Sequence, residues 1–317
     1  MGRSDRITGL RVLVLAGAGL VLAVVAASGW AAQGAGGEAR DGPTGTPPPG
    51  RVVSMNLCTD QLAMQLAAPG QLVSVSSMAR DARVSAMAAA ARRWPVNYGR
   101  AEEIYLQRPD LVLAGRYTAP DTVAMLRRLG VRVAVFDQAR ALSDVRANIM
   151  RMGRLLARSQ AAADLLAAFD ARLARLRPPD GAQRPRAVLY YANGYTLGDA
   201  TLAGQILHAA GFENAARTDP EDGGGHGYGV GGWLPLERLA MLDPDLVITA
   251  TRYPGASRAE AILDHPVVRA FRRRGRVAVH SGRDWVCGTP HVLDAIAALA
   301  GARRSLTAGG GDAGDAG

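Results

Sequence analysis

Two arginine–tyrosine pairs are the side chains of this sequence best suited to bind a small ligand. One pair is Arg116-Tyr117 and the other is Arg252-Tyr253, and each follows a run of mostly apolar residues. An arginine can form a two-pronged contact with a carboxylate, a catecholate or a phosphate. A tyrosine adds a flat face and one hydroxyl group. Together the pairs suit a large ligand that is flat or anionic, although each residue alone could equally be an ordinary surface residue.

Each pair ends a longer unit that occurs twice in the sequence. The first copy runs from Glu102 to Tyr117 and the second from Glu237 to Tyr253. Both contain a glutamate, a Pro-Asp step, an apolar run and the Arg-Tyr pair, and the second copy has one extra residue before that pair. The pattern predicts a short helix that ends near the proline, a buried strand and a loop that carries the pair. Two such units indicate two similar lobes whose loops face each other across a ligand cleft with two different walls.

Strand-like runs alternate with helical segments on both sides of a central stretch, which is typical of α/β lobes with mostly parallel sheets. We place the first lobe at residues 51–140 and the second at residues 178–306. Between them, Ser143 to Arg175 contain no proline and a single glycine, Gly153, and their apolar residues recur at helical spacing. One rigid helix of about 33 residues, about 50 Å long, would therefore join the lobes over residues 141–177.

Further ligand-binding candidates lie in loops, because ligands of open α/β sheets bind beyond the carboxyl ends of the strands. These candidates are Arg80, Tyr98, Tyr228, Trp233 and Trp285. Tyr228 belongs to the glycine-rich segment 223–232, which could form a flap over the ligand or be a plain loop. The two tryptophans could line the cleft or belong to the core, where large aromatic side chains more often lie.

The sequence predicts neither a bare metal site nor a catalytic site. No two histidines are four residues apart, and none is paired with a carboxylate in a recognised ligand spacing. A nucleophile elbow, a P-loop and a glycine-rich dinucleotide fingerprint after a strand are all absent from the sequence. We therefore expect no metal ligand, no catalytic residue and no cofactor. An exported α/β transferase or isomerase that acts on a small anionic substrate remains the alternative.

Both ends of the sequence lie outside the predicted lobes. Three arginines among the first eleven residues precede the apolar run Val12 to Ala27, which predicts a signal peptide over residues 1–32. Since a membrane span needs roughly 20 apolar residues, an uncleaved anchor is the weaker alternative. Residues 33–50 are rich in Gly, Pro and Thr and predict a flexible linker. Residues 307–317 consist mostly of Gly, Ala and Asp and predict a disordered tail.

The cysteine count and the net charge restrict the other partners. Cys58 and Cys287 are the only two cysteines, and in an exported protein they could form one disulfide or remain separate buried thiols. We hypothesise that they form the disulfide. The net charge of +9 comes from arginines scattered over helical segments, which indicates a solvated surface and no nucleic-acid partner.

These features together resemble the periplasmic substrate-binding proteins of ABC importers for ferric siderophores, haem and vitamin B12. The resemblance covers roughly residues 51–306. It includes the export signal, the two lobes, the connecting helix and the repeated Glu…Pro-Asp-Leu-Val unit. Local stretches add to it: Arg51 to Asn56, Gly211 to Asn214, His265-Pro266 and Trp285 to Gly288.

The resemblance implies a monomeric periplasmic binding protein and not an enzyme. Such a protein would deliver a metal chelate to a permease and an ATPase at the inner membrane. Arginine in both cleft loops favours a ferric siderophore, with cobalamin or haem as the next choices. The resemblance also implies that Glu102 and Glu237 dock onto arginines of the permease. The alternative is that each glutamate only stabilises the N-terminus of its helix, by about 0.3–1 kcal/mol.

Overall fold

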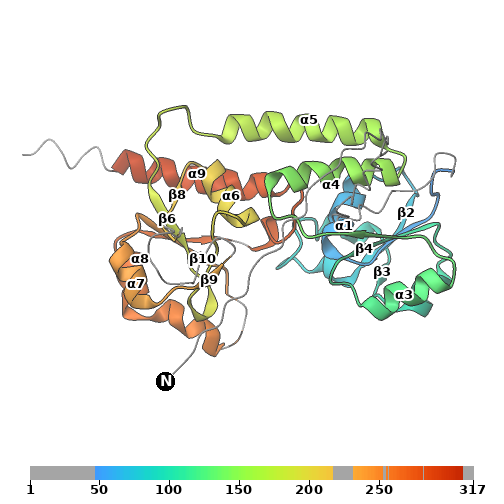
Figure 1. The fold of residues 1–317 in the computed structure, drawn as a ribbon, viewed down its shortest axis with the longest axis horizontal. Helices are drawn as coiled ribbons and strands as arrows, with labels where there is room; N and C mark the ends of the chain where they lie inside the picture. Colours follow the sequence, from blue (N-terminus) through green and yellow to red (C-terminus); the bar gives the residue numbers. More distant parts are fainter. Residues whose placement is uncertain (1–46, 217–230, 253–254, 256, 281, 310–317) are drawn as a thin grey trace, which may run out of the picture. The chain divides into compact units, whose positions relative to one another are not determined.

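The computed structural model describes residues 47–216, 231–252, 255, 257–280 and 282–309 (Figure 1). In this part of the chain the first lobe has a five-stranded parallel sheet in the order β3-β2-β1-β4-β5. Its strands are β1 (Val52–Ser54), β2 (Leu72–Ser76), β3 (Val96–Asn97), β4 (Leu111–Gly115) and β5 (Val133–Phe136). Its helices are α1 (Leu57–Leu66), α2 (Ala101–Leu106) and α3 (Pro120–Arg128), with short 3-10 helices η1 (Ser77–Arg80) and η2 (Ala90–Arg93).

The second lobe has a four-stranded parallel sheet in the order β11-β10-β6-β8, again within the described residues. Its strands are β6 (Arg186–Leu189), β8 (Glu213–Asn214), β10 (Leu246–Ala250) and β11 (Val277–His280), and β7 (Tyr195–Thr196) pairs antiparallel with β9 (Gly232–Trp233). Its helices are α6 (Leu202–Ala209), α7 (Leu236–Leu242), α8 (Pro266–Arg273) and α9 (Val292–Gly309), with η3 (Ala192–Gly194), η4 (Arg258–Asp264) and η5 (Gly282–Asp284). The two sheets confirm the prediction of two α/β lobes with mostly parallel strands.

The aspartate of each Pro-Asp step accepts a backbone hydrogen bond at the start of the first strand of its lobe. Asp110 Oδ2 accepts the backbone N–H of Arg51 at 2.8 Å, and Asp245 Oδ2 accepts that of Arg186 at 2.8 Å. The two strands that follow the Pro-Asp steps, β4 and β10, are almost entirely buried. Burial on both faces is why both read as uninterrupted apolar runs in the sequence.

The same two arginines hold the C-termini of α2 and α7. Arg51 Nη2 donates to the carbonyl oxygen of Gln107 at 2.8 Å, and Arg186 Nη1 donates to that of Leu242 at 2.9 Å. The last carbonyls of a helix lack intrahelical partners and carry partial negative charge, so a guanidinium group stabilises them. The repeated unit is therefore one local structure that the chain builds twice.

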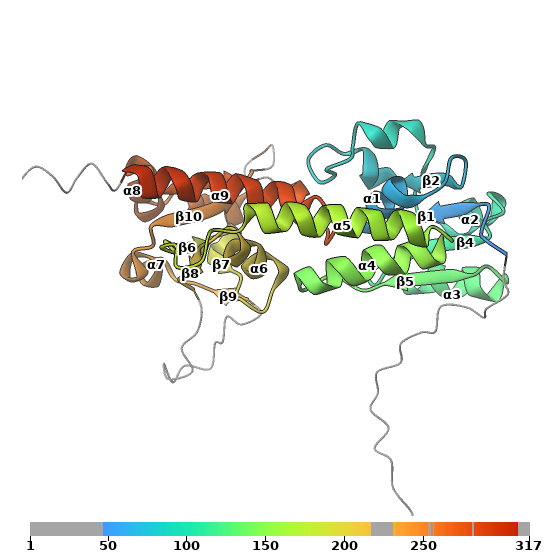
Figure 2. The ribbon, with the colours of Figure 1, turned by 90° about the horizontal axis from the view of Figure 1, so that it is seen from above.

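The prediction of one uninterrupted connecting helix is wrong. The segment forms two helices, α4 (Leu142–Leu155) and α5 (Ser159–Leu176), which pack side by side (Figure 2). Ala157 adopts a left-handed conformation with φ 55°, and the N–H of Arg158 returns to the carbonyl of Gly153 at 2.6 Å. This hydrogen-bond pattern is a Schellman C-cap, in which alanine replaces the usual glycine. The helical periodicity continued through the turn because both helices direct apolar residues into one core.

A glycine allows α4 and α5 to approach each other closely at this turn. A Cβ atom on Gly153 would lie only 2.3 Å from the Cβ of Ala162. Beyond the turn, α5 packs on α9, and Arg172 forms an ion pair with Asp294 there at 2.6 Å. The 18 residues of α5, about 27 Å long, therefore make the connection that the sequence assigned to a longer helix.

A disulfide and a buried hydrogen bond also tie the second lobe to α1. Cys58 and Cys287 are bonded, with 5.1 Å between their Cα atoms, which is the pairing that we hypothesised from the sequence. Near it, Thr289 Oγ1 donates to Gln61 Oε1 at 3.0 Å. A Cβ atom on Gly288 would lie 2.1 Å from the Cβ of Ala139, so this segment packs directly on the first lobe.

The described ends of the chain are more ordered than the sequence predicted. Pro49 is buried and its carbonyl accepts from Gln71 Nε2 at 2.8 Å, although we expected a flexible linker up to residue 50. Helix α9 continues to Gly309, past the predicted start of the tail at residue 307. The predicted signal peptide lies outside the described residues. Among those that are described, no helix combines the length and apolar character needed to cross a bilayer.

Candidate ligand-binding cleft

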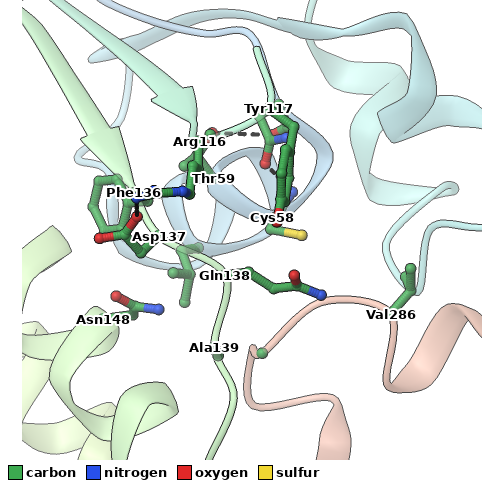
Figure 3. A pocket seen from close by; sticks show the side chains of 14 residues that line it. Cys58, Thr59, Arg116, Tyr117, Phe136, Asp137, Gln138, Ala139, Asn148 and Val286 are labelled. Atoms are coloured by element: carbon green, nitrogen blue, oxygen red, sulfur yellow. Dashed lines mark hydrogen bonds and ion pairs between the residues drawn. The ribbon is translucent and has the colours of Figure 1, made fainter. Parts of the chain in front are cut away.

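The first of two adjoining pockets lies at the carboxyl ends of β4 and β5, beside the N-terminus of α1 (Figure 3). Arg116 and Tyr117 follow β4, Asp137 and Gln138 follow β5, and Val286 comes from the second lobe. The remaining described lining residues are Asn56, Cys58, Thr59, Leu62, Gly115, Phe136, Ala139, Asn148 and Gly288. Carboxyl ends of parallel strands are where ligands of α/β proteins bind. This pocket therefore has the position that the sequence predicted for the first Arg-Tyr loop.

The second pocket lies at the carboxyl end of β10 and is rich in arginine. Arg252 follows β10, Arg283 lies in η5 after β11, and Arg83 comes from the first lobe. Val286 lines both pockets, so the two adjoin, and we refer to them together as the cleft. Its other described lining residues are Ala82, Val84, Ala250, Thr251 and Gly282. The cleft thus combines guanidinium groups with small apolar surfaces.

Aspartates pair with the arginines of the cleft. Arg116 contacts Asp137 at 2.9 Å, as Figure 3 shows, and Arg252 contacts Asp264 at 2.8 Å. The hydrogen bond from Arg252 holds the pKa of Asp264 below its usual value. The remaining pairs are Arg83 with Asp81 at 2.6 Å and Arg283 with Asp284 at 3.4 Å. The pairs of Arg116 and Arg252 are exposed to water on both sides, and such ion pairs are weak, so the carboxylate of a ligand could replace the aspartate in them.

The family comparison decides what kind of protein this is. A family model described as periplasmic binding protein matches residues 52–272, which is more than half of the chain. The chain belongs to the periplasmic binding protein family. No curated protein matches it significantly.

Solved structures resemble this periplasmic binding protein over four fifths of its chain. The periplasmic haem-binding protein BhuT, in complex with two haems, is 26% identical with a TM-score of 0.63, covering 81% of this chain and 97% of that one. A periplasmic haem-binding protein from Pseudomonas aeruginosa is 25% identical with a TM-score of 0.62, covering 80% and 92%. The vitamin B12-binding protein BtuF of Vibrio cholerae is 20% identical with a TM-score of 0.59, covering 82% and 98%, and shows the shared fold.

The structure brings three of the predicted ligand residues of this binding protein into the cleft: Arg116, Tyr117 and Arg252. Tyr98 follows β3 and is 70% exposed, and the parallel strands place it at the same edge of the sheet as Tyr117, which is 78% exposed. Tyr228 and Tyr253 lie outside the described residues.

Tyr98 and the three other described candidates are not among the described lining residues of the cleft. The guanidinium group of Arg80 donates to the carbonyl oxygen of Trp94 in its own lobe. Trp233 is 65% exposed on β9. Trp285 is half-buried, and its ring centroid lies 4.0 Å from that of His280. A role of Arg80, Trp233 and Trp285 in ligand binding therefore remains a prediction.

Several polar residues of the cleft were not predicted from the sequence, and four of them illustrate why. Gln138 and Arg283 follow the ends of β5 and β11, so the rule that found Arg116 could also have found them. Asn148 lies within α4, and Arg83 follows η1 at some distance from a strand end. Neither has a sequence signal, because only the packing of the lobes brings them to the cleft.

The two predicted docking glutamates occupy the same place in the two lobes. Glu102 is the second residue of α2 and Glu237 is the second residue of α7. Both side chains are exposed, and neither forms an ion pair with another described residue. No cluster of three or more His, Cys, Asp or Glu side chains that could hold a metal ion occurs among the described residues.

Proposed function

We propose that this chain is the periplasmic solute-binding component of an ABC importer, and that it captures a metal chelate and delivers it to the membrane permease. The observation that carries the proposal is the arginine-bearing cleft at the carboxyl ends of strands from both lobes, in a member of the periplasmic binding protein family. Binding and release complete the task of such a protein, so the ligand leaves the cleft chemically unchanged.

Haem is the first ligand to test. It combines a flat apolar ring with two carboxylates, and the cleft offers Phe136 and Val286 beside Arg116 and Arg252. Both of the reported structures that are at least 25% identical are described as haem-binding. A ferric siderophore, which the sequence alone favoured because of its arginines, becomes the second candidate, and cobalamin the third.

An exposed tyrosine could bind the iron of the chelate. Tyrosine is an established axial ligand of haem iron, and a phenolate oxygen suits ferric iron in a siderophore as well. Tyr117 lines the cleft, and Tyr98 lies at the same edge of the sheet. We propose that one of these two side chains reaches the metal, while the arginines bind the carboxylates at its periphery.

Titration of the purified mature chain tests this function. Tryptophan fluorescence is followed during addition of haemin, ferric hydroxamates, ferric catecholates, ferric citrate, cobalamin and cobinamide. We expect saturable binding of haemin at or below micromolar concentration, with the ligand recovered unchanged. Arg116→Gln and Arg252→Gln should each weaken binding about tenfold, which is the loss of one charge-assisted contact.

Two tyrosine variants identify the metal ligand in the same titration. Tyr98→Phe or Tyr117→Phe should change the Soret spectrum of bound haemin. Tyr195→Phe serves as the control, because Tyr195 on β7 is 46% exposed and is not among the described lining residues of the cleft. No response to any chelate of the panel would refute the binding function. Conversion of a chelate into a new product would favour the alternative of an enzyme.

A further inference from the structure

Two large apolar side chains are exposed at equivalent positions of the two lobes. Leu106 on α2 is 78% exposed and Met241 on α7 is 75% exposed. Each follows a proposed docking glutamate, Glu102 or Glu237, by four residues. Residues four apart lie on the same face of a helix, one turn from each other. Each lobe therefore presents an acidic group and an apolar group side by side.

Leu106 and Met241 are equivalent in the structure as well as in the sequence. Ile104 and Leu239, which lie between the glutamate and the exposed apolar residue, are completely buried. The C-terminus of each helix is held by an arginine at the start of the first strand of its lobe, Arg51 just before β1 or Arg186 in β6, through an equivalent carbonyl contact. Both helices are thus fixed from one side in the same way and leave the opposite side open to a partner.

Only the glutamate and the apolar residue are shared on the exposed side. The other positions have changed in character between the lobes: Glu103 and Tyr105 of α2 correspond to Arg238 and Ala240 of α7. A partner that presents the same contact surface twice could recognise only what the two helices have in common. The shared features are a negative charge and, one turn away, a large flexible apolar side chain.

We propose that Leu106 and Met241 join Glu102 and Glu237 in a duplicated docking surface for the permease of the importer. The permease would present, at two places, a cationic side chain beside an apolar hollow. This inference rests on the proposed function, which supplies the permease as the partner. The charges orient the encounter, while burial of the two apolar side chains slows dissociation of the complex.

Helix α3 provides matched control positions. Asp121 is the second residue of α3, and Met125, four residues later, is 42% exposed. In the second lobe, the corresponding spacing in α8 gives Val267 and the buried Phe271, so this combination is not repeated. Helix α3 packs beside α2, so substitutions on it reproduce the chemical change next to the proposed surface while leaving the residues of that surface intact.

The experiment measures the affinity of the mature chain, loaded with haemin, for the purified permease–ATPase complex of the importer in nanodiscs. Leu106→Ser and Met241→Ser should each weaken binding about tenfold at low and at high salt, as expected for loss of a buried apolar side chain. Glu102→Gln and Glu237→Gln should weaken it mainly at low salt, because salt screens the charge. Met125→Ser and Asp121→Asn should leave it unchanged, and every variant should bind haemin like the parent chain.

The outcomes separate this inference from the function on which it rests. If the parent chain does not bind the complex, the proposed function and the inference both fall. If the parent binds and the two serine variants bind within twofold of it, only the inference falls. If the parent chain forms a dimer that Leu106→Ser and Met241→Ser dissociate, the surface belongs to a second copy of the chain, and the assignment to the permease is overturned.

Discussion

At the scale of single residues, Asp60 is a carboxyl group buried on α1, and burial raises its pKa to about 7. Its Oδ2 accepts a hydrogen bond from Ser76 Oγ at 2.5 Å and its Oδ1 accepts from the N–H of Ser76 at 3.1 Å. In the unfolded chain the same group has an ordinary pKa of about 3.9. Between these two values the folded state binds the extra proton, so this group makes folding less favourable as pH rises.

The substitution Asp60→Asn should therefore stabilise the protein more at pH 8 than at pH 5. An asparagine can accept from the Ser76 N–H and can donate to Ser76 Oγ, and it has no proton to lose. Thermal unfolding of parent and variant at the two pH values measures the difference. Asp121→Asn, at an exposed position, is the control and should show no such dependence. An equal shift of Tm at both pH values would show that Asp60 titrates normally.

The residue types of the cleft were only partly predictable. Arg116 and Arg252 could be found because they lie one and two residues after the end of a buried strand, and the carboxyl ends of parallel strands are where ligands bind. Asn148 could not be found, because its place at the cleft depends on how α4 packs on the sheet. Tyr253 of the second copy, on which the symmetry argument also relied, lies outside the described residues.

At the scale of elements, the connecting segment shows where sequence periodicity is insufficient. A helical period predicts which residues face the core, and this prediction agrees with buried Ile149, Met152 and Phe169. The helical period does not reveal that the chain turns back between α4 and α5, because two antiparallel helices can pack their apolar residues into the same core. The turn at Ala157 lacks the proline or glycine that would have marked it. The one glycine near the turn, Gly153, is needed because the two helices pack closely there, and not because its backbone conformation requires glycine.

The contact between α4 and α5 can be tested at this glycine. Alanine normally stabilises a helix by about 1 kcal/mol relative to glycine, but here its Cβ would lie 2.3 Å from that of Ala162. We expect Gly153→Ala to lower the free energy of unfolding by about 1–3 kcal/mol, because the two helices must separate. The double variant Gly153→Ala, Ala162→Gly removes the clash and should recover most of the loss. Urea unfolding measures both, and a single variant more stable than the parent would contradict the packing.

At the scale of the whole molecule, the repeated unit predicted two lobes, and the alternation of strand-like and helical segments predicted their parallel sheets. The cleft was harder to predict, because its walls include Arg83, Val286 and Gly288. These residues lie in segments whose sequence shows neither the helical nor the strand spacing of apolar residues. These segments reach the cleft through contacts between the lobes. The disulfide and the Gln61–Thr289 hydrogen bond hold residues 286–288 at the cleft, where Val286 lines both pockets and Gly288 lines the first. The rigidity of this segment should therefore matter for ligand affinity as well as for stability.

Replacement of both cysteines by serine tests the coupling between the lobes and the cleft. A crosslink that closes a loop of 229 residues should contribute about 5.5 kcal/mol to stability by the loop-entropy relation. The variant should nevertheless fold, since α5 and the buried residues it shares with α9 still connect the lobes.

Without the crosslink, residues 286–288 must be ordered by the ligand itself, at a cost of about 1–2 kcal/mol for each residue that was mobile. We expect haemin affinity to fall at least tenfold, mainly through faster dissociation. The parent chain, fully reduced as judged by thiol titration, should behave like Cys58→Ser, Cys287→Ser. If both retain the affinity of the oxidised parent while unfolding at lower temperature, the disulfide stabilises the fold without shaping the cleft.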